Sequence, residues 1–149
     1  MGKRFEVTQS IMIHCPLEEV YAFMSDHRND VHWRKGVSRM ELDRPGPVTV
    51  GMQTTEVMRF MGRSLITRSE VTEAVLNQKM AFRSVSGPFP VSGYRHVEPN
   101  GGGTDLAYHL EGEVDGLFSA LSFVLTPVFR RQIAADLKRL KAHLERVTI

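Results

Sequence analysis

Histidine and cysteine side chains near the start of the chain are the first candidates for chemistry, because His14, Cys15, His27 and His32 could bind a metal ion. Their spacing matches no standard zinc pattern, since the chain has a single cysteine and therefore no C-x-x-C pair. His14 and Cys15 are also adjacent on an extended stretch, where successive side chains diverge. Cys15 as a nucleophile would need a base and an orienting group, which no local motif supplies. We therefore predict no metal site and no cofactor.

The known motifs of phosphate-binding and nucleophilic enzymes are absent from the sequence. The glycine run at 101–103 precedes a predicted strand rather than a helix, so its amides gain nothing from a helix dipole and a hairpin tip is predicted instead. Neither G-x-S-x-G, nor a pair of histidines on one helix face, nor a nucleotide fingerprint occurs. Catalytic residues stay unknown from the sequence, and whether the protein is an enzyme stays open.

The strand predicted at 91–97 carries the strongest polar candidate for an internal site. In one register Arg95 faces the interior together with the apolar positions of the strand, and in the other Tyr94 and His96 do. Only the first register buries a charge, which then needs a partner. An ion pair, an exposed strand end and a ligand anchor are the alternatives for this arginine. The candidate counter-ions lie on neighbouring strands: Glu56, Glu70 and Glu73.

A series of strands must position these side chains. Alternating apolar and polar residues predict a first strand at 5–13, after which Pro16 marks a helix start with Glu18 and Glu19 in its first turn. A short helical segment around Trp33 follows. Tight-turn signals then separate strands that favour an antiparallel meander, predicted at 37–42, 52–60, 64–74, 79–85, 91–97 and 104–111, with a loop at 99–103 before the last of them.

The last third of the chain predicts one long amphipathic helix that opens at the Thr126–Pro127 step and ends near Arg146. Its apolar residues recur at spacings of four, three and four, and so lie along one face. They are Ile133, Leu137, Leu140 and Leu144. A single helix cannot bury such a stripe alone and needs a sheet to lie against. Between a curved sheet and one helix we expect a cavity.

Composition limits the classes of partner and compartment. The 149 residues carry a net charge of only +2, and the basic residues are scattered except in the C-terminal helix, so we predict no nucleic-acid binding. The most apolar stretch, 117–129, is too short to span a membrane. The lone cysteine fits a reducing compartment, and no signal peptide is visible, which predicts a cytoplasmic protein. We expect one domain over 1–149, and a homodimer is compatible with these features.

Several local motifs accompany this order of elements: the strand-to-helix passage 13–21, Ser25-Asp26, Trp33, the Gly-Pro-Phe-Pro run at 87–90, Gly103-Thr104 and the segment 136–141. With these motifs the chain resembles the START-like, Bet v 1-like (SRPBCC) superfamily, and within it the polyketide cyclase/dehydrase-like group of bacterial proteins. The resemblance spans essentially the whole chain. It implies an α+β helix-grip fold, in which a curved antiparallel sheet of six to seven strands surrounds a long C-terminal helix, with two short helices after the first strand.

The resemblance and the strand parity together indicate an internal ligand site. We predict that it binds a small hydrophobic molecule, lipid-like or aromatic and polyketide-like, between the sheet and the helix. The alternative that the resemblance permits is a cofactor-independent polyketide cyclase, aromatase or dehydratase. An interaction module that uses the basic C-terminal helix is a third hypothesis. The predicted ligand-binding residues are Phe82, Arg95, Tyr108, Phe118, Ser122, Leu125 and Phe129.

Overall fold

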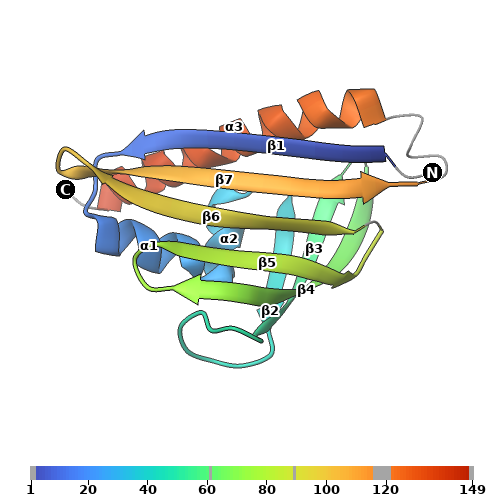
Figure 1. Ribbon diagram of the computed structural model, residues 1–149, viewed down its shortest axis with the longest axis horizontal. Helices are drawn as coiled ribbons and strands as arrows, with labels where there is room; N and C mark the ends of the chain where they lie inside the picture. Colours follow the sequence, from blue (N-terminus) through green and yellow to red (C-terminus); the bar gives the residue numbers. More distant parts are fainter. Residues whose placement is uncertain (1–2, 61, 89, 116–121, 148–149) are drawn as a thin grey trace.

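Seven strands form one antiparallel sheet in the computed structural model, which describes residues 3–60, 62–88, 90–115 and 122–147. Their order across the sheet is β1-β7-β6-β5-β4-β3-β2, so β2 to β7 form a meander and β1 pairs with β7 (Figure 1). The strands are β1 (Lys3–Ile13), β2 (Val37–Leu42), β3 (Gln53–Phe60), β4 (Arg63–Val75), β5 (Lys79–Ser86), β6 (Val91–Asn100) and β7 (Gly103–Val114).

The helices lie where the chain leaves the first strand and after the last one. Pro16 is the N-cap residue of α1 (Leu17–Ser25), whose first turn carries Glu18 and Glu19 as predicted. A 3-10 helix (His27–Asn29) and α2 (Asp30–Trp33) follow, and α3 (Ser122–Val147) is the long C-terminal helix.

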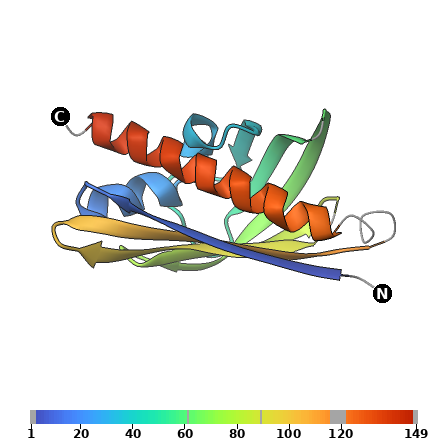
Figure 2. The same ribbon diagram turned by 90° about the horizontal axis from the view of Figure 1, so that it is seen from above.

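The sheet curls around α3, so that β2, β3 and β4 rise beside the helix while β1, β7 and β6 pass beneath it (Figure 2). The predicted stripe faces the sheet: Ile133, Leu137, Leu140 and Leu144 are all buried. Burying each such side chain stabilises the fold by about 1.5–3 kcal/mol. They join one core with apolar residues of β1, α1, α2, β6 and β7. This is the helix-grip arrangement that the resemblance implies.

The start of the long helix differs from the prediction. It begins at Ser122, and Pro127 lies inside it rather than at its opening. Proline has no N–H to donate to the carbonyl four residues earlier, which here belongs to Phe123. The side chain of Phe123 is 77% exposed, so this end of the helix lies at the surface, where water can replace the lost donor.

The hairpin between β6 and β7 is tighter than the predicted loop at 99–103. Asn100 pairs with Gly103 and Pro99 with Thr104, which leaves only Gly101 and Gly102 in the turn. Both turn residues have positive φ, at 54° and 91°, as a two-residue hairpin turn requires and as glycine tolerates. The proline therefore marks a strand end here, and β6 continues three residues past its predicted limit of 97.

Candidate functional site

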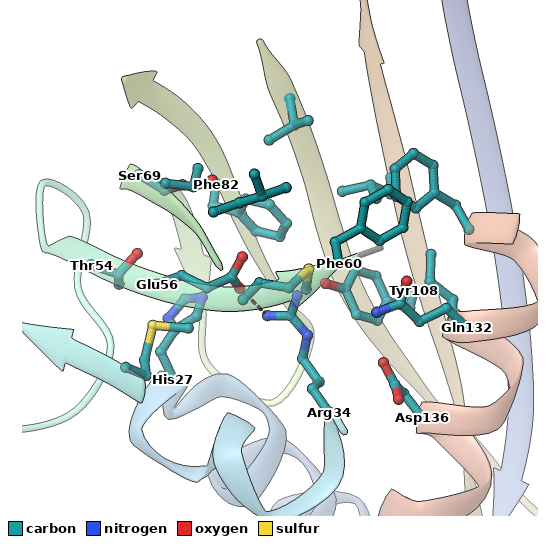
Figure 3. A pocket seen from close by; sticks show the side chains of 18 of the residues that line it. His27, Arg34, Thr54, Glu56, Phe60, Ser69, Phe82, Tyr108, Gln132 and Asp136 are labelled. Carbon is teal, nitrogen blue, oxygen red and sulfur yellow. Dashed lines mark hydrogen bonds and ion pairs between the residues drawn. The ribbon is translucent and has the colours of Figure 1, made fainter. Parts of the chain in front are cut away.

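A cavity of about 110 Å³ lies between the concave face of the sheet and α3. All seven strands contribute side chains to one wall, and α3 supplies the other together with His27 of the 3-10 helix and Arg34, which follows α2. Figure 3 shows most of its lining side chains. The full lining is Phe5, His27, Arg34, Met40, Thr54, Glu56, Met58, Phe60, Leu65, Thr67, Ser69, Phe82, Pro88, Val91, Arg95, Tyr108, Leu110, Phe129, Gln132, Ile133 and Asp136.

Three phenylalanine rings form an aromatic part of the wall. Phe129 of α3 stacks on Phe60 of β3, with ring centroids 5.5 Å apart and planes inclined by 21°. The ring of Phe5 from β1 lies on Phe129 at a centroid distance of 5.0 Å. Aromatic rings provide large apolar area and favour offset or tilted contacts with another ring. This part of the cavity wall is therefore apolar.

A buried ionic cluster lies around Asp30, at the start of α2. Arg95 of β6 donates to both carboxylate oxygens of Asp30, with Nη1–Oδ1 at 3.0 Å and Nη2–Oδ2 at 2.7 Å. Its Nη1 also donates to the Met24 carbonyl at 2.7 Å. The Arg95 guanidinium lies over the rings of both Trp33 and Tyr108, 4.8 and 4.9 Å from their centroids. Arg95 and Asp30 are 1% and 0% exposed, so this charge pair is held away from water.

Arg34 extends the cluster into the cavity. Its Nη1 donates to Asp30 Oδ2 at 3.0 Å and to Glu56 Oε1 of β3 at 2.5 Å. Figure 3 shows this Arg34–Glu56 contact crossing from the helical side of the cavity to the sheet. Burial by itself would raise the pKa of Asp30, but the charges of Arg95 and Arg34 outweigh burial and lower that pKa to about 2. Both ion pairs are therefore charged at neutral pH.

His27 is a polar lining residue without a charge partner of its own. Its side chain is 4% exposed, and its ring meets the Phe82 ring edge-on at a centroid distance of 6.2 Å. Burial lowers the pKa of His27 to about 4, so the imidazole is neutral at neutral pH. Its Nδ1 atom is buried and has no hydrogen-bond partner.

Asp136 brings a carboxyl group to the cavity from α3. Its Oδ1 accepts hydrogen bonds from Arg139 Nη1 at 2.5 Å and from the Lys35 backbone N–H at 3.3 Å. Burial raises the pKa of Asp136 above its ordinary value, although the neighbouring arginines oppose that effect. Gln132 lines the cavity one turn earlier on the same helix, as Figure 3 shows.

The structure brings together four of the seven residues predicted to bind a ligand. Phe82, Arg95, Tyr108 and Phe129 line the cavity. Leu125 is buried in the core but is not part of the lining. The Ser122 backbone begins α3, and its side chain lies outside the described residues, as does the whole of Phe118.

The register of β6 is the one that places Arg95 inside. Tyr94 lies on the other face of the sheet, where its ring stacks on His109 at 4.8 Å. The predicted counter-ions were wrong: Asp30 pairs with Arg95, while Glu56 pairs with Arg34, Glu70 with Arg83 and Glu73 with Lys79. Sequence reasoning did not assign Asp30 or Arg34 to the site, because neither short helix has a periodic pattern that fixes which side chain turns inward.

Within the ranges that the structure describes, no three His, Cys, Asp or Glu side chains gather closely enough to hold a metal ion. Nor does any helix there have the length and apolarity needed to cross a membrane.

The chain is similar to known proteins over nearly its whole length. The family model for polyketide cyclase/dehydrase and lipid transport proteins matches residues 4–145. No curated protein matches the sequence. Among solved structures, TTHA0849 from Thermus thermophilus superposes with a TM-score of 0.84 at 22% identity, covering 97% of this chain and 99% of that one. The Zhui aromatase/cyclase from Streptomyces sp. R1128 gives 0.84 at 15% identity, covering 99% and 97%.

A plant protein shares the same fold. The ginseng major latex-like protein 151 from Panax ginseng superposes with a TM-score of 0.67 at 14% identity, covering 94% of this chain and 97% of that one. At these identities the structures establish a common fold, whereas the family model rests on the sequence itself. The chain belongs to the polyketide cyclase/dehydrase and lipid transport family, within the START-like, Bet v 1-like superfamily.

Proposed function

We propose that this protein binds a small hydrophobic molecule in the cavity between the sheet and α3. The observation that carries the proposal is the lining itself, which joins stacked aromatic rings to a fixed polar cluster. Ligand sites in proteins are mostly apolar with a few well-placed polar groups. The cavity volume of about 110 Å³ is of the same order as the roughly 150 Å³ apolar cavity that holds benzene in another protein.

The energetics favour an apolar occupant oriented by the polar cluster. Removing about 200 Å² of apolar ligand surface from water contributes about 5 kcal/mol, before the costs of association reduce it. The apolar surface of such a ligand would contact Phe60, Phe82 and Phe129 in the cavity walls. The family description supports the proposal, because it names both lipid transport and polyketide chemistry.

A cavity-filling substitution tests this function. Leu65 and Ile66 are neighbours on β4, but Leu65 lines the cavity and the Ile66 side chain is 59% exposed. We expect the neutral fluorescent probe N-phenylnaphthylamine to bind the wild type with saturation. Leu65→Trp should weaken that binding at least tenfold, and Ile66→Trp should leave it unchanged. Absence of saturable binding to the wild type, or equal binding by both variants, would contradict an internal binding site.

A second candidate is cofactor-independent catalysis of an aldol-type cyclisation or dehydration. The observation that favours it is that a neutral imidazole, His27, and a carboxyl of raised pKa, Asp136, line one cavity with the Arg34 guanidinium. Such chemistry needs a base to remove a proton next to a carbonyl, and a donor to the oxygen that becomes negative. Incubating the protein with a poly-β-ketone thioester tests it: ring formation above the uncatalysed rate, lost in Asp136→Asn, is the expected result.

A further inference from the structure

The polar groups of the cavity differ in whether they already have a partner. Arg95 is paired with Asp30, Arg34 with Glu56, and Asp136 with Arg139. These three pairs leave the charges around the cavity balanced.

Unsatisfied buried polar atoms are found among the same side chains. Of the buried side-chain nitrogens and oxygens in the described part of the chain, only three have no hydrogen-bond partner: His27 Nδ1, Trp33 Nε1 and Arg95 Nε. His27 and Arg95 line the cavity. The Arg95 guanidinium already makes three hydrogen bonds and is covered by two rings, whereas the structure shows no hydrogen bond from the His27 ring. The His27 ring lines the cavity and neither of its nitrogens has a hydrogen-bond partner in the structure, so a ligand oxygen beside this ring would supply one.

We infer that the cavity selects a neutral molecule carrying a hydroxyl or carbonyl oxygen, and that His27 is the specificity-determining hydrogen-bond partner of that oxygen. The inference rests on the proposed binding function and names its ligand class. A neutral imidazole has one donor nitrogen and one acceptor nitrogen, so it can serve a hydroxyl in either role and a carbonyl as a donor.

The ionic cluster explains why the ligand is neutral. A ligand carboxylate in the cavity would have to pair with the Arg34 guanidinium. It would compete for that guanidinium with Glu56, whose Oε1 lies 2.5 Å from Arg34 Nη1. Whichever carboxylate lost the competition would remain partly buried without a counter-ion, at a cost of several kcal/mol. A simple fatty-acid anion is therefore disfavoured, and an uncharged oxygen is accepted.

Displacement of N-phenylnaphthylamine by three molecules of similar shape tests the inference. They are β-naphthol, β-methylnaphthalene, which replaces the hydroxyl by a methyl group, and the anion β-naphthoate. In the wild type we expect β-naphthol to bind about three- to tenfold more tightly than β-methylnaphthalene, the range given by one net hydrogen bond. We expect β-naphthoate to bind at least tenfold more weakly than β-naphthol.

His27→Phe should abolish the preference for the hydroxyl while keeping the ring and its edge contact with Phe82. The matched control is His32→Phe, because His32 is exposed and outside the lining, and it should keep the wild-type ratio. His27→Gln, which retains a donor and an acceptor, should keep part of the preference and serves if the phenylalanine variant does not fold.

The possible failures are distinguishable. If neither the probe nor any naphthalene binds the wild type, the proposed function itself is wrong. If they bind but β-naphthoate equals β-naphthol, the selection for neutral ligands is overturned while the binding function stands. An unchanged preference for the hydroxyl in His27→Phe would equally overturn the role of His27.

Discussion

Asp30 is the single residue on which the polar end of the cavity depends. It receives two buried hydrogen bonds from Arg95 and a partly buried one from Arg34. Because buried charges are costly without partners, the two guanidinium groups are tolerated here only through the carboxylates that face them. Loss of the Asp30 charge would leave Arg95 without any anion, while Arg34 would keep Glu56.

We predict that Asp30→Asn lowers the free energy of unfolding by about 3–5 kcal/mol, since removing one partner leaves a buried charge uncompensated. Urea denaturation at neutral pH measures the effect. Glu41→Gln is the matched acid-to-amide control, because Glu41 pairs with Arg39 on the surface, and its midpoint should stay close to that of the wild type. Similar midpoints for the two variants would show that Asp30 is not the buried counter-ion.

Strand parity predicts several of the side chains that line the cavity, but it does not predict which residue pairs with the buried arginine. Alternation along β5, β6 and β7 places Phe82, Arg95 and Tyr108 on one face, as the structure does, although for β6 it allows two registers. It cannot reveal the partner of Arg95, because Asp30 lies 65 residues away on a helix of one turn. From residue type alone His27 is a candidate metal ligand, which its spacing argues against, and only the fold places it in a cavity.

At the scale of elements, α3 and the sheet stabilise each other through one apolar stripe. Leu137 is 1% exposed, whereas the adjacent Lys138 points to solvent. We predict that Leu137→Ala lowers the free energy of unfolding by about 2–5 kcal/mol and that Lys138→Ala changes it little. Urea midpoints of the two variants measure the difference, and comparable values would mean that the helix face is misassigned.

Gly93 is the place where β6 allows close approach of its neighbours. A Cβ atom added there would lie 2.3 Å from the His109 carbonyl oxygen and 3.0 Å from Phe82 Cζ. The first contact is with backbone that cannot swing away, and the second would push a ring that lines the cavity.

We therefore predict that Gly93→Ala costs about 1–3 kcal/mol of stability, as overpacking usually does, and also alters the affinity for N-phenylnaphthylamine. Thermal unfolding and probe titration measure the two effects. Ser92→Ala, one residue earlier on the same strand, is the control and should change neither. A fully stable Gly93→Ala would show that the β6–β7 spacing is wider than the structure has it.

The elements themselves follow from the sequence to different degrees. The strands and the meander from β2 to β7 are predictable because alternation and turn residues act locally, whereas no local signal predicts that β1 pairs with β7. Two prolines make the predicted element boundaries wrong. Pro127 resembles a helix start but lies inside α3, and Pro99 resembles a loop residue but lies in β6. Proline restricts only its own φ and its own N–H, so neighbouring contacts decide whether an element continues past it.

At the scale of the whole molecule, the curled sheet and its helix enclose ionisable groups together with apolar ones. The unfolded chain exposes these groups to water, so folding changes their affinity for protons. This couples the stability of the fold to pH through the same residues that shape the cavity. His27 and Asp30 act in two separate pH ranges.

For His27, burial lowers the pKa from 6.5 to about 4 in the folded protein. Between these values the unfolded state takes up a proton that the folded state refuses, so stability falls as the pH falls from 6.5 to about 4. The loss amounts to about 3 kcal/mol. For Asp30, whose pKa falls from 3.8 to about 2 despite its burial, the stabilisation is present above 3.8 and is lost as the pH falls through about 2.

The prediction is that the free energy of unfolding of His27→Phe declines less steeply than that of the wild type between about pH 7 and about pH 4. The matched control His32→Phe should follow the wild-type curve, because His32 lies at the surface of the folded protein and outside the cavity lining. Urea unfolding at a series of pH values measures these curves. Because the wild type and each variant share all other histidines, the difference between their curves is the contribution of the substituted ring. Parallel curves for the wild type and His27→Phe would mean that His27 is hydrated or paired in the folded protein. That result would contradict the description of His27 as a buried imidazole without a hydrogen-bond partner.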